Sequence, residues 1–195
     1  VTAARKRHTL AGAGHRLDNG RLAQLSDQTD GGNMGSLPTG EVAGMTYEDL
    51  LDVAEHKWDQ RFLDLARHVA GWSKDPSTKV GAVVADDRHQ VLSVGYNGFP
   101  AGMRDNADLY EDRPTKYSRI IHAEMNALLH MREPLTPHMT LYTWPMPPCD
   151  RCMVHLIQAG LRHVVSQGCQ RQPWMDAIEK AESYLREVHG TLILL

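Results

Sequence analysis

Two short motifs constrain the fold of this chain more than any other feature of its sequence. The first is His122-Ala123-Glu124, and the second is Pro148-Cys149-Asp150-Arg151-Cys152. His122, Cys149 and Cys152 offer one imidazole nitrogen and two sulfurs, which are donors that zinc prefers in a tetrahedral site. Glu124 adds a carboxylate that is not required as a ligand. A fold that uses both motifs must bring them together at one metal ion.

Local signals place both motifs at the beginnings of helices. Proline suits the opening of a helix because its missing N–H would be unpaired there. Pro148 therefore predicts a helix from Cys149 to Ala159, with both cysteine sulfurs on one face of its first turn. A second helix is expected to begin near His122 and to carry Glu124 in its first turn. Because the positive end of a helix favours thiolates, two inward-pointing helix starts would suit a metal between them.

Three protein ligands leave the fourth zinc position open, which is typical of a catalytic site. Glu124 is then placed to take a proton from the zinc-bound water without becoming a ligand. A closed structural site needs a fourth ligand, and His155 does not supply it, because it lies roughly 120° around the helix from Cys149. Cys169 is predicted to be a buried free thiol. The pattern favours a catalytic zinc site over a structural one or a chance Cys-x-x-Cys pair.

Downstream of residue 45, the hydrophobic pattern alternates between helices and strands. A helix is predicted from Thr46 to Gly71, followed by an antiparallel hairpin of strands Val80–Ala85 and Val91–Tyr96, and then by an irregular polar stretch over residues 98–118. Alternating elements favour parallel strands with right-handed crossovers, so we expect an α/β fold, a three-layer α-β-α sandwich with a mixed sheet of roughly five strands. The other predicted elements are a helix from His122 that Pro134 stops, strands Met139–Thr143, His163–Ser166 and Thr191–Leu194, and helices Cys149–Ala159 and Pro173–Val188.

Composition and charge indicate one globular domain preceded by a tail. The chain has 195 residues, of which 42% are hydrophobic, and a formal net charge of -3. These values suit one domain with a sizeable core, and the balanced charge argues against nucleic acid as a partner. Residues 1–44 are expected to be a flexible tail and residues 45–195 the folded domain. Arg5-Lys6-Arg7 is interpreted as part of a solvated tail rather than as a targeting or nucleic-acid arm.

The number of cysteines and the hydropathy of the chain indicate in which cellular compartment the protein is expected. Three cysteines, two of them in one Cys-x-x-Cys pair, do not form the disulfide framework of a small secreted protein. No apolar run reaches the length of about eighteen residues that a membrane span needs, and the N-terminus lacks the apolar run of a secretory signal. We therefore expect a cytoplasmic protein with no membrane partner.

Further segments accompany the metal motifs along the chain. They are Ser73–Ala82, which reads Ser-Lys-Asp-Pro-Ser-Thr-Lys-Val-Gly-Ala, the loop Gly95–Pro100, which reads Gly-Tyr-Asn-Gly-Phe-Pro, and the extension of the first motif to Ala127. Gln158-Ala159-Gly160 follows the cysteines. From residue 73 to about residue 168 the chain resembles the deoxycytidylate deaminase family of the zinc-dependent cytidine deaminase superfamily.

The resemblance implies a cytidine deaminase-like fold and one Zn²⁺ ion per chain, held by His122, Cys149 and Cys152. It implies hydrolytic deamination of deoxycytidine monophosphate (dCMP) to deoxyuridine monophosphate (dUMP) and ammonia, which supplies dUMP for thymidylate synthesis. Glu124 would be the catalytic residue that passes a proton from zinc-activated water to N3 of the cytosine ring and afterwards protonates the leaving amine. Also implied are a homo-oligomer such as a hexamer, and deoxycytidine and thymidine triphosphates (dCTP and dTTP) as effectors.

The same resemblance suggests residues for the substrate or an effector. Asn97 follows a strand and is implied to hydrogen-bond a sugar hydroxyl or a phosphate. Four cations are phosphate candidates, although exposed Lys and Arg are usually only solvated. Trp144 either stacks on a base or packs in the core. The full predicted set is Lys74, Lys79, Asn97, Lys116, Arg119, Ala123 and Trp144.

One segment departs from the common pattern of the family. Residues 142–148 carry about one residue more before the cysteines and include Trp144-Pro145-Met146, which is expected to reshape a wall of the base or sugar pocket.

The alternatives to dCMP deamination are deamination of another cytosine nucleoside or nucleotide, deamination of a base in transfer RNA, and a non-catalytic zinc-stabilised binding protein. The absence of a dense basic stripe outside the tail argues against a polynucleotide substrate.

Overall fold

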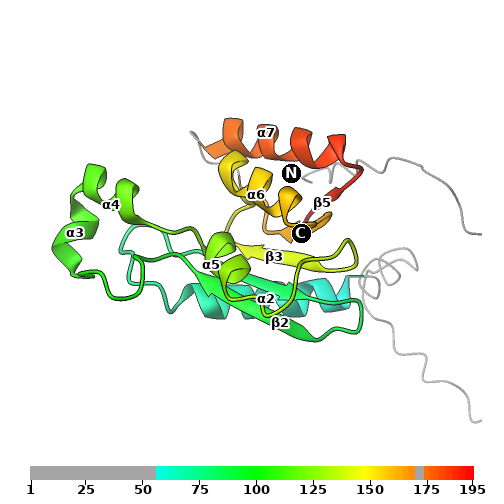
Figure 1. Cartoon of the computed structure of the whole chain (residues 1–195), viewed down its shortest axis with the longest axis horizontal. Helices are drawn as coiled ribbons and strands as arrows, with labels where there is room; N and C mark the ends of the chain where they lie inside the picture. Colours follow the sequence, from blue (N-terminus) through cyan, green and yellow to red (C-terminus); the bar gives the residue numbers. More distant parts are fainter. Residues whose placement is uncertain (1–55, 170–173) are drawn as a thin grey trace, which may run out of the picture. The chain divides into compact units, whose positions relative to one another are not determined.

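The structure is a computed structural model that describes residues 56–169 and 174–195. The tail predicted at residues 1–44 and the beginning of the helix predicted at Thr46 lie outside the described residues. From residue 123 onward the described helices and strands alternate along the chain as predicted (Figure 1). None of the helices in these two ranges has the length and apolar character needed to cross a membrane.

A five-stranded sheet forms the middle of the fold, with strand order β2-β1-β3-β4-β5. The first two strands form the predicted antiparallel hairpin, and β1 also pairs antiparallel with β3. The pairs β3–β4 and β4–β5 are parallel, so the sheet is mixed as expected. The strands are β1 (Gly81–Ala85), β2 (Val91–Tyr96), β3 (Thr140–Trp144), β4 (His163–Ser166) and β5 (Thr191–Leu194).

Helices cover both faces of this sheet (Figure 1). One face packs against α2 (Lys57–Ala70), where Phe62 and Ala66 join Val83 of β1 in one buried cluster. The other face packs against α5 (Ala123–Leu129), α6 (Asp150–Gln158) and α7 (Trp174–Glu187), whose apolar residues form a second cluster with Ala82 and Val84. Successive residues of β1 thus point to opposite cores, as the pleat of a strand requires. The predicted three-layer sandwich is confirmed.

Gly95 of β2 allows α5 to lie directly on the sheet. A Cβ atom at this position would collide with the backbone of Ala123 and Ala127, which both belong to α5. The contact is secured by Ser93, whose hydroxyl donates a hydrogen bond of 2.7 Å to the carbonyl of Ala127. Because α5 begins directly after His122, this close packing determines where His122 and Glu124 lie.

The prediction of an irregular stretch over residues 98–118 is wrong. This stretch contains α3 (Ala107–Glu111) and most of α4 (Arg113–Arg119). Both helices are short and mostly polar, so they lack the long apolar periodicity that marks a helix in a sequence. Stacking of Phe99 on Tyr110, with ring centroids 4.3 Å apart, attaches α3 to the loop after β2.

Candidate active site

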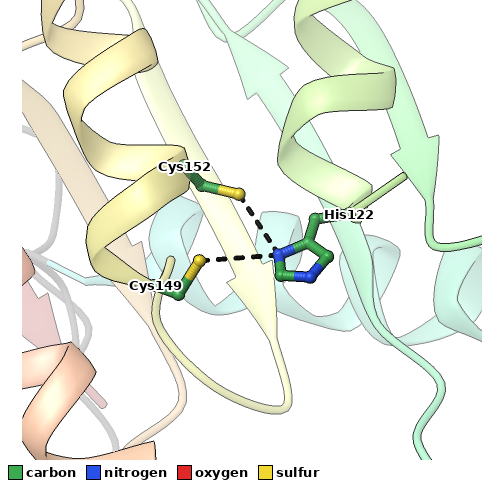
Figure 2. A group of neighbouring side chains, drawn as sticks. All are labelled: His122, Cys149 and Cys152. Atoms are coloured by element: carbon green, nitrogen blue, oxygen red, sulfur yellow. Dashed lines mark hydrogen bonds between the residues drawn. The ribbon is translucent and has the colours of Figure 1, made fainter. Parts of the chain in front are cut away.

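His122, Cys149 and Cys152 form a group of possible metal ligands in the structure. Their ligand atoms all lie within 4.8 Å of one another. His122 Nδ1 is 3.5 Å from Cys149 Sγ and 3.3 Å from Cys152 Sγ (Figure 2). Tetrahedral zinc, with Zn–N of about 2.0–2.1 Å and Zn–S of about 2.3 Å, separates its N and S ligands by roughly 3.5 Å. The three side chains therefore fit one Zn²⁺ ion, and no other such group occurs among residues 56–169 and 174–195.

The ligands come from the starts of two helices, as expected. Figure 2 shows His122 pointing from the start of α5 toward the two cysteines at the start of α6. Cys149 is the N-cap of α6 with an extended backbone, not a member of the first turn, so this detail of the prediction is wrong. Its sulfur still lies near that of Cys152, because residues three apart at a helix start are about one turn apart.

The other candidates for a fourth ligand are not in this group. His155 is exposed, and its Nδ1 lies 2.7 Å from the carbonyl oxygen of Arg151. Its predicted exclusion from the metal site is therefore confirmed. Cys169 is a free cysteine, as predicted, but it is half-buried rather than buried because β4 has already ended at Ser166.

The imidazole and the two sulfurs shift one another's protonation. A hydrogen bond from Cys152, helped by His122, lowers the pKa of Cys149 to about 4 despite burial. A hydrogen bond to Cys149 raises the pKa of His122 to about 9, although burial opposes this shift. The pKa of Cys152 is raised by its hydrogen bond with Cys149 and by burial. Zinc binding requires neutral imidazole and thiolates, so it releases protons from this group.

Glu124 lies in the first turn of α5 and is almost fully buried. Its Oε2 is the one buried side-chain polar atom without a hydrogen-bond partner in the described part of the chain. Burial raises the pKa of this carboxyl group above its ordinary value. An unpaired buried carboxylate oxygen is costly, and in a native protein it usually indicates a functional role.

Glu124 and two of the metal ligands line a common cavity of about 630 Å³. This part of the lining consists of His122, Ala123, Glu124 and Cys149. The segment after β3 contributes Met146 and Pro147, which supports the expectation that this divergent segment shapes the pocket. The other walls are residues 75–78, Val80 and Asn97, then Tyr110, Glu111, Arg113, Lys116, Tyr117 and Ile120, and finally Trp174, Ala177 and Ile178 of α7.

Lys116 lines the cavity, but its ammonium group is already bound. Its Nζ lies 2.7 Å and 2.9 Å from the two carboxylate oxygens of Asp75, and it donates to Ser77 Oγ at 2.6 Å. These contacts use all three donors of an ammonium group. Burial alone would raise the pKa of Asp75, but the hydrogen bonds from Lys116 and Ser77 keep that pKa below its ordinary value. The structure gives Lys116 a structural partner instead of a free N–H for phosphate.

Asn97 also lines the cavity while its side chain holds the neighbouring loop. Its Oδ1 accepts a hydrogen bond of 2.8 Å from the Val80 amide. Its Nδ2 donates to Thr78 O at 2.8 Å and to Asp75 Oδ2 at 3.2 Å. Both amide hydrogens are therefore used within the protein, and only acceptor capacity on Oδ1 remains for a ligand. A direct contact of Asn97 with substrate stays a prediction.

The structure does not place the other predicted substrate residues on the cavity wall, except for Ala123. Lys74 is exposed and pairs with Asp105 at 2.9 Å. Lys79 is exposed and Arg119 is half-buried, and neither lines the cavity. Trp144 packs against the core cluster on the α2 side, so the core-packing alternative is the one observed.

Sequence reasoning missed several residues that line the cavity, notably Arg113, Tyr117 and Trp174. Arg113, Lys116, Tyr117 and Ile120 recur at the i, i+3, i+4 and i+7 spacing of one helix face. That spacing could have predicted α4 from the sequence, but most of the residues on this helix face are polar, whereas helices are usually recognised by an apolar face. Nothing in the local sequence of Trp174 indicates that the start of α7 reaches the cavity.

Comparison with known proteins agrees with this geometry. A family model described as the cytidine and deoxycytidylate deaminase zinc-binding region matches residues 56–167. A protein of Aliivibrio fischeri, an "uncharacterized deaminase in luxG 3′region", is 42% identical over 108 residues, which cover 55% of this chain and 71% of that protein. A "probable deoxycytidylate deaminase" of Caenorhabditis elegans is 38% identical over 116 residues, which cover 58% of this chain and 57% of that protein.

A solved structure shares the fold. It is the crystal structure of dCMP deaminase from the cyanophage S-TIM5 in complex with dCMP and dUMP. The match has a TM-score of 0.57 and 23% sequence identity, and it covers 71% of this chain and 97% of that one. The expected cytidine deaminase-like fold is thereby confirmed.

Proposed function

This chain belongs to the cytidine and deoxycytidylate deaminase family with its zinc-binding region at residues 56–167, and from that premise we propose that it deaminates dCMP. The reaction consumes water and yields dUMP and ammonia. One observation carries the proposal: Glu124, whose Oε2 has no hydrogen-bond partner, lines the same cavity as His122 and Cys149, two of the three side chains that fit zinc. A purely structural zinc site has no use for a buried carboxylate of this kind.

The residues divide the chemistry between them. When held by His122, Cys149 and Cys152, zinc supplies the Lewis-acid chemistry that makes water a nucleophile at neutral pH. Glu124 has a carboxylate oxygen free to accept a proton, and it lies in the same helical turn that follows His122. It passes one proton of the water to N3 of the cytosine ring and the second to the departing amine, while the oxygen becomes the carbonyl of the product. The surrounding walls orient the ring and restrict the access of bulk water.

Two findings support dCMP as the substrate. The C. elegans relative is named a probable deoxycytidylate deaminase, and the S-TIM5 enzyme with the same fold was solved with dCMP and dUMP. The cavity of about 630 Å³ is within the size range of ligand sites and has room for a nucleotide. The chain spans 57% to 71% of the length of the two curated relatives described above, so the activity of the whole protein is part of the proposal.

The direct test uses purified, zinc-loaded protein and a panel of cytosine compounds. Deoxycytidine, dCMP, dCTP and the corresponding ribose compounds are incubated separately, and ammonia and uracil-containing product are measured. We expect the highest kcat/KM for dCMP. Turnover of unphosphorylated nucleosides alone would contradict the dCMP assignment but leave the zinc chemistry intact. No turnover of any of them, with zinc bound, would contradict the proposed enzyme.

Regulation and assembly stay predictions from the family resemblance. A homo-oligomer such as a hexamer is tested by sedimentation of the full chain, and dCTP and dTTP as effectors are tested by adding each to the dCMP assay.

We also propose residues 45–195 as the catalytic domain. A reducing cytoplasm is the proposed compartment, because Cys149 and Cys152 must stay reduced to act as thiolate ligands.

A further inference from the structure

We propose that Arg113 binds the 5′-phosphate of the substrate and so makes the site selective for a nucleotide over a nucleoside. This inference rests on the proposed deaminase function. A phosphate group carries charge close to -2 near neutral pH and needs a cationic partner in the cavity. The question is which cation of the chain is both on the cavity wall and free to bind it.

The contacts of the basic residues show which of them is free to bind a phosphate. Arg113 and Lys116 are the two basic residues that line the cavity in the described part of the chain, apart from the metal ligand His122. Lys116 is bound to Asp75 and Ser77 by all three of its donors, so this pair contributes almost no net charge. Arg113 forms no ion pair with any residue in the described ranges and is exposed to solvent. Among the described residues, Arg113 is thus the Lys or Arg of the cavity lining that has no ion-pair partner.

The geometry of α4 explains why this arginine faces the site and Arg119 does not. Lys116 and Tyr117 line the cavity together with Arg113, and they follow it at i+3 and i+4 on one helix face. Arg119 lies outside that spacing and off the cavity wall. The buried contact between Lys116 and Asp75 holds the helix in this rotation.

The chemistry of the side chain suits a phosphate. The planar guanidinium of Arg offers paired N–H donors that match two phosphate oxygens. The carboxylates of Asp75, Glu111 and Glu124 also line the cavity, so its lining is not a continuous basic patch. A single cation in this setting suits one terminal phosphate group better than the backbone of a polynucleotide.

The test compares kcat/KM for dCMP and for deoxycytidine in the wild type, Arg113→Ala and Arg113→Lys. We expect Arg113→Ala to lower kcat/KM for dCMP by about 10- to 100-fold, mainly through KM, because one charge-assisted phosphate contact is lost. The value for deoxycytidine should stay the same, and Arg113→Lys should recover part of the loss. Bound zinc is measured in each variant to confirm an intact site.

Arg104→Ala is the matched control, because Arg104 is an exposed cation in the same region that pairs with Asp108 outside the cavity. It should not change the preference for dCMP. Either of two results would overturn the assignment. The first is an Arg113→Ala variant that keeps the preference for dCMP over deoxycytidine, whether kcat/KM falls equally for both compounds or for neither. The second is an Arg119→Ala variant that loses this preference instead. A wild type that does not prefer dCMP to deoxycytidine would instead refute the proposed function, so the two failures are distinguishable.

Discussion

Lys116 Nζ lies 2.7 Å from Asp75 Oδ2, and both side chains are almost fully buried although they are 41 residues apart in the sequence. A second pair, Lys74 with Asp105, joins the same two segments at 2.9 Å but is solvent-exposed. The charges are reversed between the pairs, since the first segment contributes Lys74 and Asp75 and the second contributes Asp105 and Lys116. The two pairs attach the segment before α3, and α4 itself, to the loop before β1, and residues of both segments line the cavity.

These two pairs predict different costs for two similar substitutions. Lys116→Met leaves the buried Asp75 carboxylate without its cation, and we expect it to lower the free energy of unfolding by about 3–5 kcal/mol. Lys74→Met removes an exposed pair, and the expected loss is about 0–1 kcal/mol. Chemical denaturation of the zinc-loaded variants measures both. Equal losses in the two variants would show that burial of Lys116 has no energetic consequence.

The lowered pKa of Asp75 predicts a dependence of stability on pH. Its folded-state pKa is below the ordinary value of 3.8, so the unfolded chain binds a proton more readily than the folded chain. The stabilisation is present above the unfolded pKa and is lost as pH falls through the folded pKa. The difference in unfolding free energy between wild type and Asp75→Asn should therefore shrink below about pH 4. Urea midpoints of both proteins between neutral and acid pH test this, and a constant difference would contradict it.

The role proposed for Glu124 predicts loss of turnover without loss of metal. Glu124→Gln keeps the shape of the side chain but cannot shuttle a proton, so we expect kcat to fall by about 10²- to 10⁴-fold. Zinc content should stay near one ion per chain, because the ligand group does not include Glu124. Glu179→Gln, at an exposed position of α7 that does not line the cavity, serves as the control. Wild-type turnover in Glu124→Gln would rule out the shuttle.

The metal ligands predict a contrast between two cysteines. Cys152→Ser should lose zinc and thermal stability together, since ligand binding is coupled to folding. Cys169→Ser should keep both, because Cys169 is outside the ligand group. Metal analysis and thermal unfolding, each with and without a chelator, measure the two effects. If Cys169→Ser released zinc, the ligand assignment would need revision.

Much of the fold followed from local signals. Strands β4 and β5 begin and end where the sequence pattern predicted, because each contains a short apolar run that follows polar residues or a glycine. Helix α5 ends at Leu129, earlier than the predicted stop at Pro134, because a proline only sets a limit that a helix need not reach. Helices α3 and α4 escaped prediction because tertiary contacts, such as the stack of Phe99 on Tyr110, hold them in place.

The sequence by itself determined the metal chemistry of this protein. The identity and spacing of His122, Cys149 and Cys152 define the donor atoms, and Glu124 is recognisable as the carboxylate that is not a ligand. These conclusions depend on residue type and on the spacing within each of the two motifs, which are local properties.

Only the tertiary structure decided which polar residues surround the cavity. It pairs Lys116 with Asp75, places Trp144 in the core, and leaves Arg113 on the cavity lining without an ion-pair partner among the described residues. Whether a lysine or arginine is free depends on partners distant in the sequence and on the rotation of its helix. Neither quantity is encoded in the local pattern of residues, because both result from packing between elements.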